Sequence, residues 1–62
     1  MGTNLKEIRK GKYIGLYQDV KSKEYEIWKV CGEPERWDWG ITNQDDAKEI
    51  QAYADKHYTD GL

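Results

Sequence analysis

Two short runs rich in Tyr, Ile, Val and Trp, residues 12–20 and 24–31, flank the dipeptide Lys21-Ser22. Runs of this composition and length, separated by turn residues, are typical of two β-strands joined in a hairpin. If Lys21-Ser22 forms a two-residue turn, Val20 pairs with Lys23, and the register of the whole hairpin follows. This register restricts the fold most, because it decides which side chains share a face of the sheet.

The predicted register separates an aliphatic face from an aromatic one. The first face carries Ile14, Leu16, Tyr25 and Ile27, and the second carries Tyr13, Tyr17, Trp28 and Val30. Gly15 then lies directly opposite Trp28, and an aromatic ring that covers a strand glycine supports this register. A shift by one residue would instead turn Glu24 and Glu26 toward the core.

The segments around the hairpin predict an α+β domain that spans residues 1–62. Glu33-Pro34-Glu35 ends the second strand, because proline cannot donate a hydrogen bond to a sheet, and Trp37 to Ile41 suits a third strand. Residues 4–10 fit either a short helix or a further strand. The predicted fold is a three-stranded antiparallel sheet, alone or preceded by a short N-terminal helix or strand, packed by one C-terminal α-helix.

The C-terminal helix is predicted to be amphipathic. Thr42 or Asn43 can cap its start and Gly61 can end it. Its apolar face consists of Ala47, Ile50, Ala54 and Tyr58, with Tyr53 and His57 on the flank. Its charged face consists of Asp45, Lys48, Glu49, Ala52, Asp55 and Lys56.

One helix covers one face of such a sheet, and the aliphatic face of the hairpin matches it better. The face with Tyr13, Tyr17 and Trp28 is then either open for binding or covered by the N-terminal segment or a dimer partner. Trp37-Asp38-Trp39 is a second aromatic feature. If the segment is extended, both indoles lie on one face. They then either form a stacking platform, or one of them, Trp39 by preference, packs at the edge of the core while the other is half exposed.

Composition predicts a small, folded chain without a cofactor. With 62 residues, ten Leu, Ile or Val and no Phe, the core is lean, so a homodimer is a reasonable expectation. Eight aromatic residues and a net charge of only −2 nevertheless favour a folded state. One Cys and one His exclude an internal disulfide and a four-ligand zinc site, and no other metal motif is present.

No motif in the chain predicts catalysis. Cys31 and His57 are the only pair that resembles a nucleophile and its base, and a buried structural thiol is the simpler interpretation. Phosphate loops and dinucleotide fingerprints are absent from the sequence. It also has no apolar run of the length that a membrane span requires and no signal-peptide pattern. The expectation is a cytoplasmic protein that is not an enzyme.

Charge is divided unevenly along the chain. Residues 1–32 carry a net charge of +3, whereas residues 33–62 carry −5. The leading hypothesis is therefore a non-catalytic protein-binding module whose acidic and aromatic side chains occupy a basic, nucleic-acid-binding partner. The predicted partner-binding residues are Tyr13, Tyr17, Trp28, Trp37, Glu33, Glu35, Asp38, Asp45 and Glu49.

In size, acidity and lack of catalytic residues, the chain resembles the small inhibitors that phages use against host defence, including anti-CRISPR proteins. The resemblance is one of kind. It implies a protein target in the host cytoplasm and carries over no residue roles.

Two alternatives use other chemistry. In the first, Tyr13, Tyr17 and Trp28 stack on bases while the hairpin lysines contact phosphates. A helix–three strands–helix order would resemble double-stranded RNA-binding domains, but their final helix begins with lysines, whereas here the sequence is Asn43-Gln44-Asp45-Asp46. A pI near 5.3 also disfavours polyanion binding. The second alternative is a structural subunit that oligomerises through an open sheet face.

Overall fold

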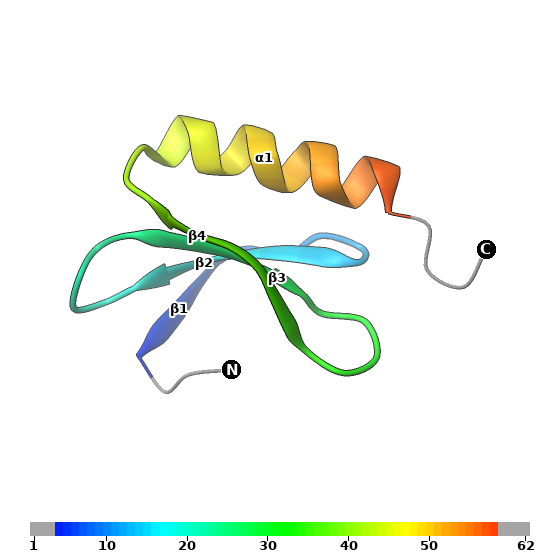
Figure 1. The fold of residues 1–62 in the computed structure, drawn as a ribbon, viewed down its shortest axis with the longest axis horizontal. Coiled ribbons are helices and arrows are strands. Elements are labelled where there is room, and N and C mark those ends of the chain that lie inside the picture. The colour runs from blue at the N-terminus through cyan, green and yellow to red at the C-terminus, as the bar shows by residue number, and fades with distance from the viewer. Residues whose placement is uncertain (1–3, 59–62) are drawn as a thin grey trace.

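The computed structural model describes residues 4–58, which form four strands and one helix. The elements are β1 (Leu5–Arg9), β2 (Ile14–Asp19), β3 (Tyr25–Lys29), β4 (Glu35–Ile41) and α1 (Gln44–His57). The strands form one antiparallel sheet in the order β1-β2-β3-β4, and α1 lies across one face of it (Figure 1). The predicted α+β class is confirmed, but the sheet has four strands rather than three, because residues 5–9 pair with β2.

The register predicted for the central hairpin is confirmed. Gly15 pairs with Trp28 and Leu16 with Ile27, as expected. The turn is wider than the predicted pair Lys21-Ser22, since the backbone N–H of Asp19 donates to the carbonyl of Glu24 over 2.9 Å. Four residues, 20–23, therefore connect the strands. A loop that is longer by one residue on each side leaves the pairing of the strands unchanged.

The side chain of Asp19 organises this turn. Its Oδ1 accepts hydrogen bonds from the backbone N–H groups of Ser22 and Lys21, at 3.1 and 2.8 Å. These bonds lower the pKa of the Asp19 carboxyl below its ordinary value. Lys23 completes the turn with a φ of 67°, a left-handed conformation that few non-glycine residues adopt.

The core forms where the aliphatic face of the hairpin meets α1, as predicted. Ile14, Leu16 and Ile27 are fully buried, and Tyr25 and Ala47 complete the cluster. Each is at an alternate strand position or on the inner side of the helix, so the two-residue period of β2 and β3 directs them to the same side. These few side chains supply most of the apolar burial that stabilises the domain.

The helix is rotated relative to the amphipathic pattern. Gln51, not Ile50, lies in the interface and is only 3% exposed, whereas Ile50 is 37% exposed. Both ends of the buried amide are hydrogen-bonded: its Nε2 donates to the carbonyl of Ile14 over 2.7 Å, and its Oε1 accepts from Arg9 Nε over 2.8 Å. The prediction that Ile50 belongs to the core face was wrong because polar contacts with the backbone, rather than hydropathy alone, orient α1.

Asp55 was also misplaced on the charged outer face. It is half-buried, and its carboxylate accepts hydrogen bonds from the backbone N–H groups of Tyr13, Ile14 and Lys12. The start of the helix is as predicted: the side chain of Asn43 accepts a hydrogen bond from the N–H of Asp46. The helix ends at His57, and the proposed stop at Gly61 lies outside the described residues.

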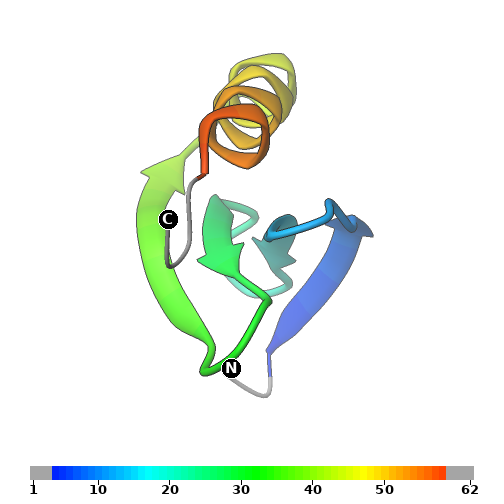
Figure 2. The same cartoon turned by 90° about the vertical axis from the view of Figure 1, so that its right-hand side faces the viewer.

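The sequence left the aromatic face either open or covered, and on the sheet face that points away from α1 the structure shows Tyr17 buried and Trp28 half-buried. The strands β1 and β4 curl away from the helix on either side of β2 and β3 (Figure 2). Tyr17 is only 6% exposed and lies over Gly15, where an added Cβ would be 3.0 Å from the tyrosine ring. Tyr17, not Trp28, therefore covers the strand glycine. Tyr13 is not on this face at all, because it packs against the core cluster.

Strand β4 interrupts the alternation that was assumed for its two indoles. Its register against β3 shifts twice, on either side of the Ile27–Asp38 pair, and Gly40 has a φ of 74°. Trp37 contacts Tyr58, whereas Trp39 is 55% exposed and lies under the guanidinium of Arg36. The two indoles have different neighbours and do not form a shared platform. Trp37, rather than the expected Trp39, contacts a ring that packs against the core.

Candidate functional site: an acidic groove beside the helix

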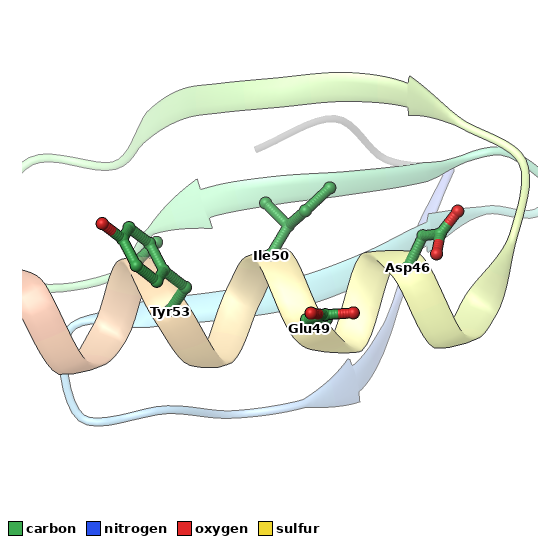
Figure 3. Close-up of a pocket in the computed structure, with 5 residues that line it drawn as sticks. Asp46, Glu49, Ile50 and Tyr53 are labelled. Carbon is green, nitrogen blue, oxygen red and sulfur yellow. The ribbon is translucent and has the colours of Figure 1, made fainter.

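A groove of about 440 Å³ runs along the side of α1 that faces β4 (Figure 3). It is lined by Asp46, Glu49, Ile50, Tyr53 and Ala54. The groove exists because α1 packs mainly over β2 and β3, while β4 bends away from the helix (Figure 2). The helix side next to β4 is thus left partly uncovered, and Tyr53 is 68% exposed there.

The floor of the groove is apolar and its acidic side chains come from the first half of α1. Ile50 and Asp46 point toward β4 (Figure 3). Asp46 belongs to the first helical turn, where a carboxylate is stabilised by the helix dipole. The groove lining is therefore acidic, and the basic residues Lys56 and His57 follow in the last turn of the helix.

A cluster of aromatic rings lies near the C-terminus of α1. Tyr58 contacts Trp37 edge to face, with ring centroids 5.3 Å apart, and contacts Tyr13 at 5.2 Å. Such edge-to-face pairs each contribute about 0.5–1.5 kcal/mol beyond simple burial. Trp37 contacts this cluster through Tyr58 and remains 43% exposed. His57 stacks on Tyr53 at 4.3 Å in the same region.

Strand β4 adds a further exposed carboxylate. Asp38 is the register partner of Ile27, between the two register shifts of the strand. Its Oδ1 accepts the backbone N–H of Trp39 over 2.9 Å. Arg36, the basic residue of this strand, forms a salt bridge with Glu26 at 3.8 Å, and its guanidinium lies 4.2 Å from the ring centroid of Trp39.

The structure brings together some of the predicted partner-binding residues and separates others. Trp37, Asp38 and Glu49 lie on the elements that bound the groove, and the remaining acids are exposed on α1 or near the start of β4: Asp45, Glu33 and Glu35. Tyr17 and Trp28 are not part of it, since Tyr17 is buried on the far face and Trp28 is half-buried beside Glu26. Tyr13 contributes only indirectly, through its contact with Tyr58.

Sequence reasoning missed the residues that line most of the groove. Ile50 and Tyr53 were assigned to the core face and its flank, and Asp46 was not singled out. The available signal was the polar pair Gln51 and Asp55, which lie one helical turn apart. If Gln51 and Asp55 are placed on the side of the helix that faces the sheet, Ile50 and Tyr53 fall on a side of the helix that the sheet does not cover.

The other potentially reactive side chains that the structure describes do not form a metal site. Among residues 4–58, no group of three or more His, Cys, Asp or Glu could hold a metal ion. Cys31 is half-buried just after β3. Within the same residues, no helix is both long and apolar enough to cross a membrane.

No protein-family model matches this chain, and neither the curated proteins nor the solved structures contain a significant match to it. Functional inference therefore depends on the geometry of the groove and its charges.

Proposed function

We propose that this chain is a non-catalytic protein-binding module whose groove beside α1 holds a basic and apolar segment of a partner. The observation that supports this most is the combination of Ile50, Tyr53 and Ala54 with the carboxylates of Asp46 and Glu49 in one groove. Exposed aromatic and aliphatic side chains become buried when a partner binds, which drives association. The carboxylates favour a partner segment with positive charge.

The finer proposal concerns what the partner does. Proteins bind nucleic acids through Lys and Arg side chains that neutralise phosphates. A module with an acidic groove, and with further exposed carboxylates at Glu33 and Glu35 near the start of β4, would compete with nucleic acid for such a surface. In this proposal the chain is an inhibitor of a nucleic-acid-binding protein, in the manner of the small phage inhibitors that it resembles in kind.

Direct nucleic-acid binding has less support from the geometry. That hypothesis needs Tyr13, Tyr17 and Trp28 to stack on bases. Tyr17 is buried over Gly15, and Tyr13 packs on Tyr58 against the core. Two of the three rings therefore lack the free face that base stacking requires.

Site-specific photo-crosslinking tests the proposed function. A photoreactive phenylalanine in place of Tyr53 lies in the groove, and the same group in place of the exposed Val20 lies in the turn between β2 and β3. We expect position 53, but not position 20, to crosslink to a protein in lysate of the native host. The crosslinked peptide is expected to be rich in Lys and Arg.

A matched pair of helix variants completes the test. Ile50→Asp places a charge on the floor of the groove, whereas Ala52→Asp places it at an exposed position of the same helix. Crosslinking from position 53 should be lost in the first and retained in the second, with circular dichroism confirming that both are folded. Equal crosslinking from positions 20 and 53, or capture of acidic peptides, would contradict the proposal.

A further inference from the structure

The side of α1 that lines the groove is complementary to a second copy of itself. Asp46, Ile50, Tyr53 and His57 recur at spacings of four, three and four residues, which places them in one stripe along the helix. The centre of the stripe is apolar and exposed. Asp46 lies at the acidic first turn, and Glu49 and Lys56, seven residues apart, carry opposite charges along one flank of the stripe.

We propose that two copies of the chain pair through α1, antiparallel and about a two-fold axis, so that each helix fills the groove of the other. In this arrangement Ile50 of one copy faces Tyr53 of the other, and this contact occurs twice. The acidic pair Asp46 and Glu49 then faces Lys56 and His57 of the second copy at both ends. An interface made of the same patch on both copies closes on itself and gives a dimer rather than a filament.

Two features of the structure favour a helix as the occupant over an added strand. Strand β4, the edge beside the groove, has two register shifts against β3. Its Trp39 N–H is already bonded to the side chain of Asp38. Bulges and occupied donors of this kind are how edge strands resist pairing with another chain. The helix side, by contrast, offers the exposed apolar side chains of Ile50 and Tyr53 between an acidic first turn and a basic last turn.

This inference rests on the same groove as the proposed function, and it adds a regulatory consequence. Because the dimer covers Ile50 and Tyr53, self-association and partner binding exclude each other. The fraction of chains whose groove is unoccupied would then fall as the concentration of the chain rises. The chain would be self-masked when abundant and would bind its partner as a monomer.

Sedimentation velocity of the full chain across micromolar to millimolar concentrations tests the pairing. We expect a reversible monomer–dimer equilibrium in the wild type. Ile50→Glu should raise the dissociation constant at least tenfold, whereas Ala52→Glu, which adds the same charge at an exposed position of α1, should leave it within about twofold. A wild type that stays monomeric throughout, or two variants that behave alike, would overturn the proposal.

A charge exchange tests the antiparallel orientation. Glu49→Lys and Lys56→Glu each place like charges opposite one another at both ends of the dimer, so each variant alone should dimerise more weakly. An equimolar mixture of the two restores opposite charges at both ends, and we expect it to recover the sedimentation coefficient of the dimer. A mixture that stays monomeric would refute the antiparallel pairing. The crosslinking experiment reads partner binding separately, so failure of the dimer and failure of the proposed function are distinguishable.

Discussion

The carboxylate of Asp55, near the end of α1, accepts a 2.6 Å hydrogen bond from the backbone N–H of Tyr13, at the start of β2. One helical turn earlier, Gln51 bonds to the backbone carbonyl of Ile14. These two polar side chains fix the rotation of the helix on the sheet. The rotation turns Ile50 and Tyr53 outward, so the polar contacts on one side of α1 create the groove on the other.

Removal of this carboxylate should destabilise the domain. Asp55→Ala leaves the backbone N–H groups of Tyr13 and Ile14 without their acceptor, and an unsatisfied donor costs about 1–3 kcal/mol. Urea denaturation measures the loss as a lower midpoint. Asp45→Ala is the matched control, because Asp45 is exposed and its expected loss is limited to a helix-dipole contribution of about 0.3–1 kcal/mol. Equal midpoints for the two variants would show that the Asp55 contacts do not stabilise the fold.

The same carboxylate predicts a loss of stability in acid. Burial alone would raise the pKa of Asp55, but the hydrogen bonds from Tyr13, Ile14 and Lys12 and the charge of Lys12 outweigh it, so the pKa lies below its ordinary value of 3.8. A lowered folded-state pKa means that this stabilisation is fully present above about pH 4 and is lost as the pH falls through the folded value.

The free energy of unfolding, measured in urea from neutral pH down to about pH 2, tests this acid dependence. The difference between wild type and Asp55→Asn should be largest near neutral pH and should shrink in acid. Asp19→Asn is expected to show a smaller effect of the same sign, because the lowered pKa of Asp19 comes from backbone hydrogen bonds at an exposed turn. Curves for wild type and Asp55→Asn that stay parallel in acid would contradict this assignment.

Gly11 should tolerate no side chain. A Cβ at this position would overlap the carbonyl of Ile14 and lie 2.6 Å from Gln51 Nε2 and 2.9 Å from Asp55 Cγ. Gly11→Ala would therefore push apart the contacts that dock α1, and we expect thermal unfolding to report a loss of about 1–3 kcal/mol. Gly32→Asn is the control, since Gly32 has open space around it and asparagine tolerates its φ of 64°. A Gly11→Ala variant as stable as this control would argue against close docking at this point.

Tyr17 should titrate later than an ordinary tyrosine. Its burial, and then the nearby negative charge of Glu7, raise its pKa above the ordinary value of 10.0. Because the raised pKa favours the neutral phenol in the folded state, this stabilisation is present below about pH 10 and is lost as the pH rises through the folded value. Absorbance at alkaline pH should show a late-titrating component that disappears in Tyr17→Phe and moves to lower pH in Glu7→Gln. A Tyr17→Phe variant that keeps the late component would rule out this assignment.

The sequence alone determined the central hairpin and the start of the helix. The pairing of Gly15 with Trp28 and the burial of Leu16 and Ile27 follow from an alternation of two residues, which is local and leaves only one register with both apolar faces intact. The N-cap at Asn43 is equally local, because it depends on the side chain of one residue and the backbone of the next turn.

Only the tertiary structure decided where the remaining surfaces lie. Residues 5–9 become a strand because β2 offers them a free edge, which their own composition does not specify. The rotation of α1 depends on hydrogen bonds from Gln51 and Asp55 to backbone groups about forty residues away in the chain. Backbone donors and acceptors are the same at every residue and leave no trace in a hydropathy pattern. The groove that we propose as the binding site is a consequence of those contacts, and it therefore emerged only when the chain was folded.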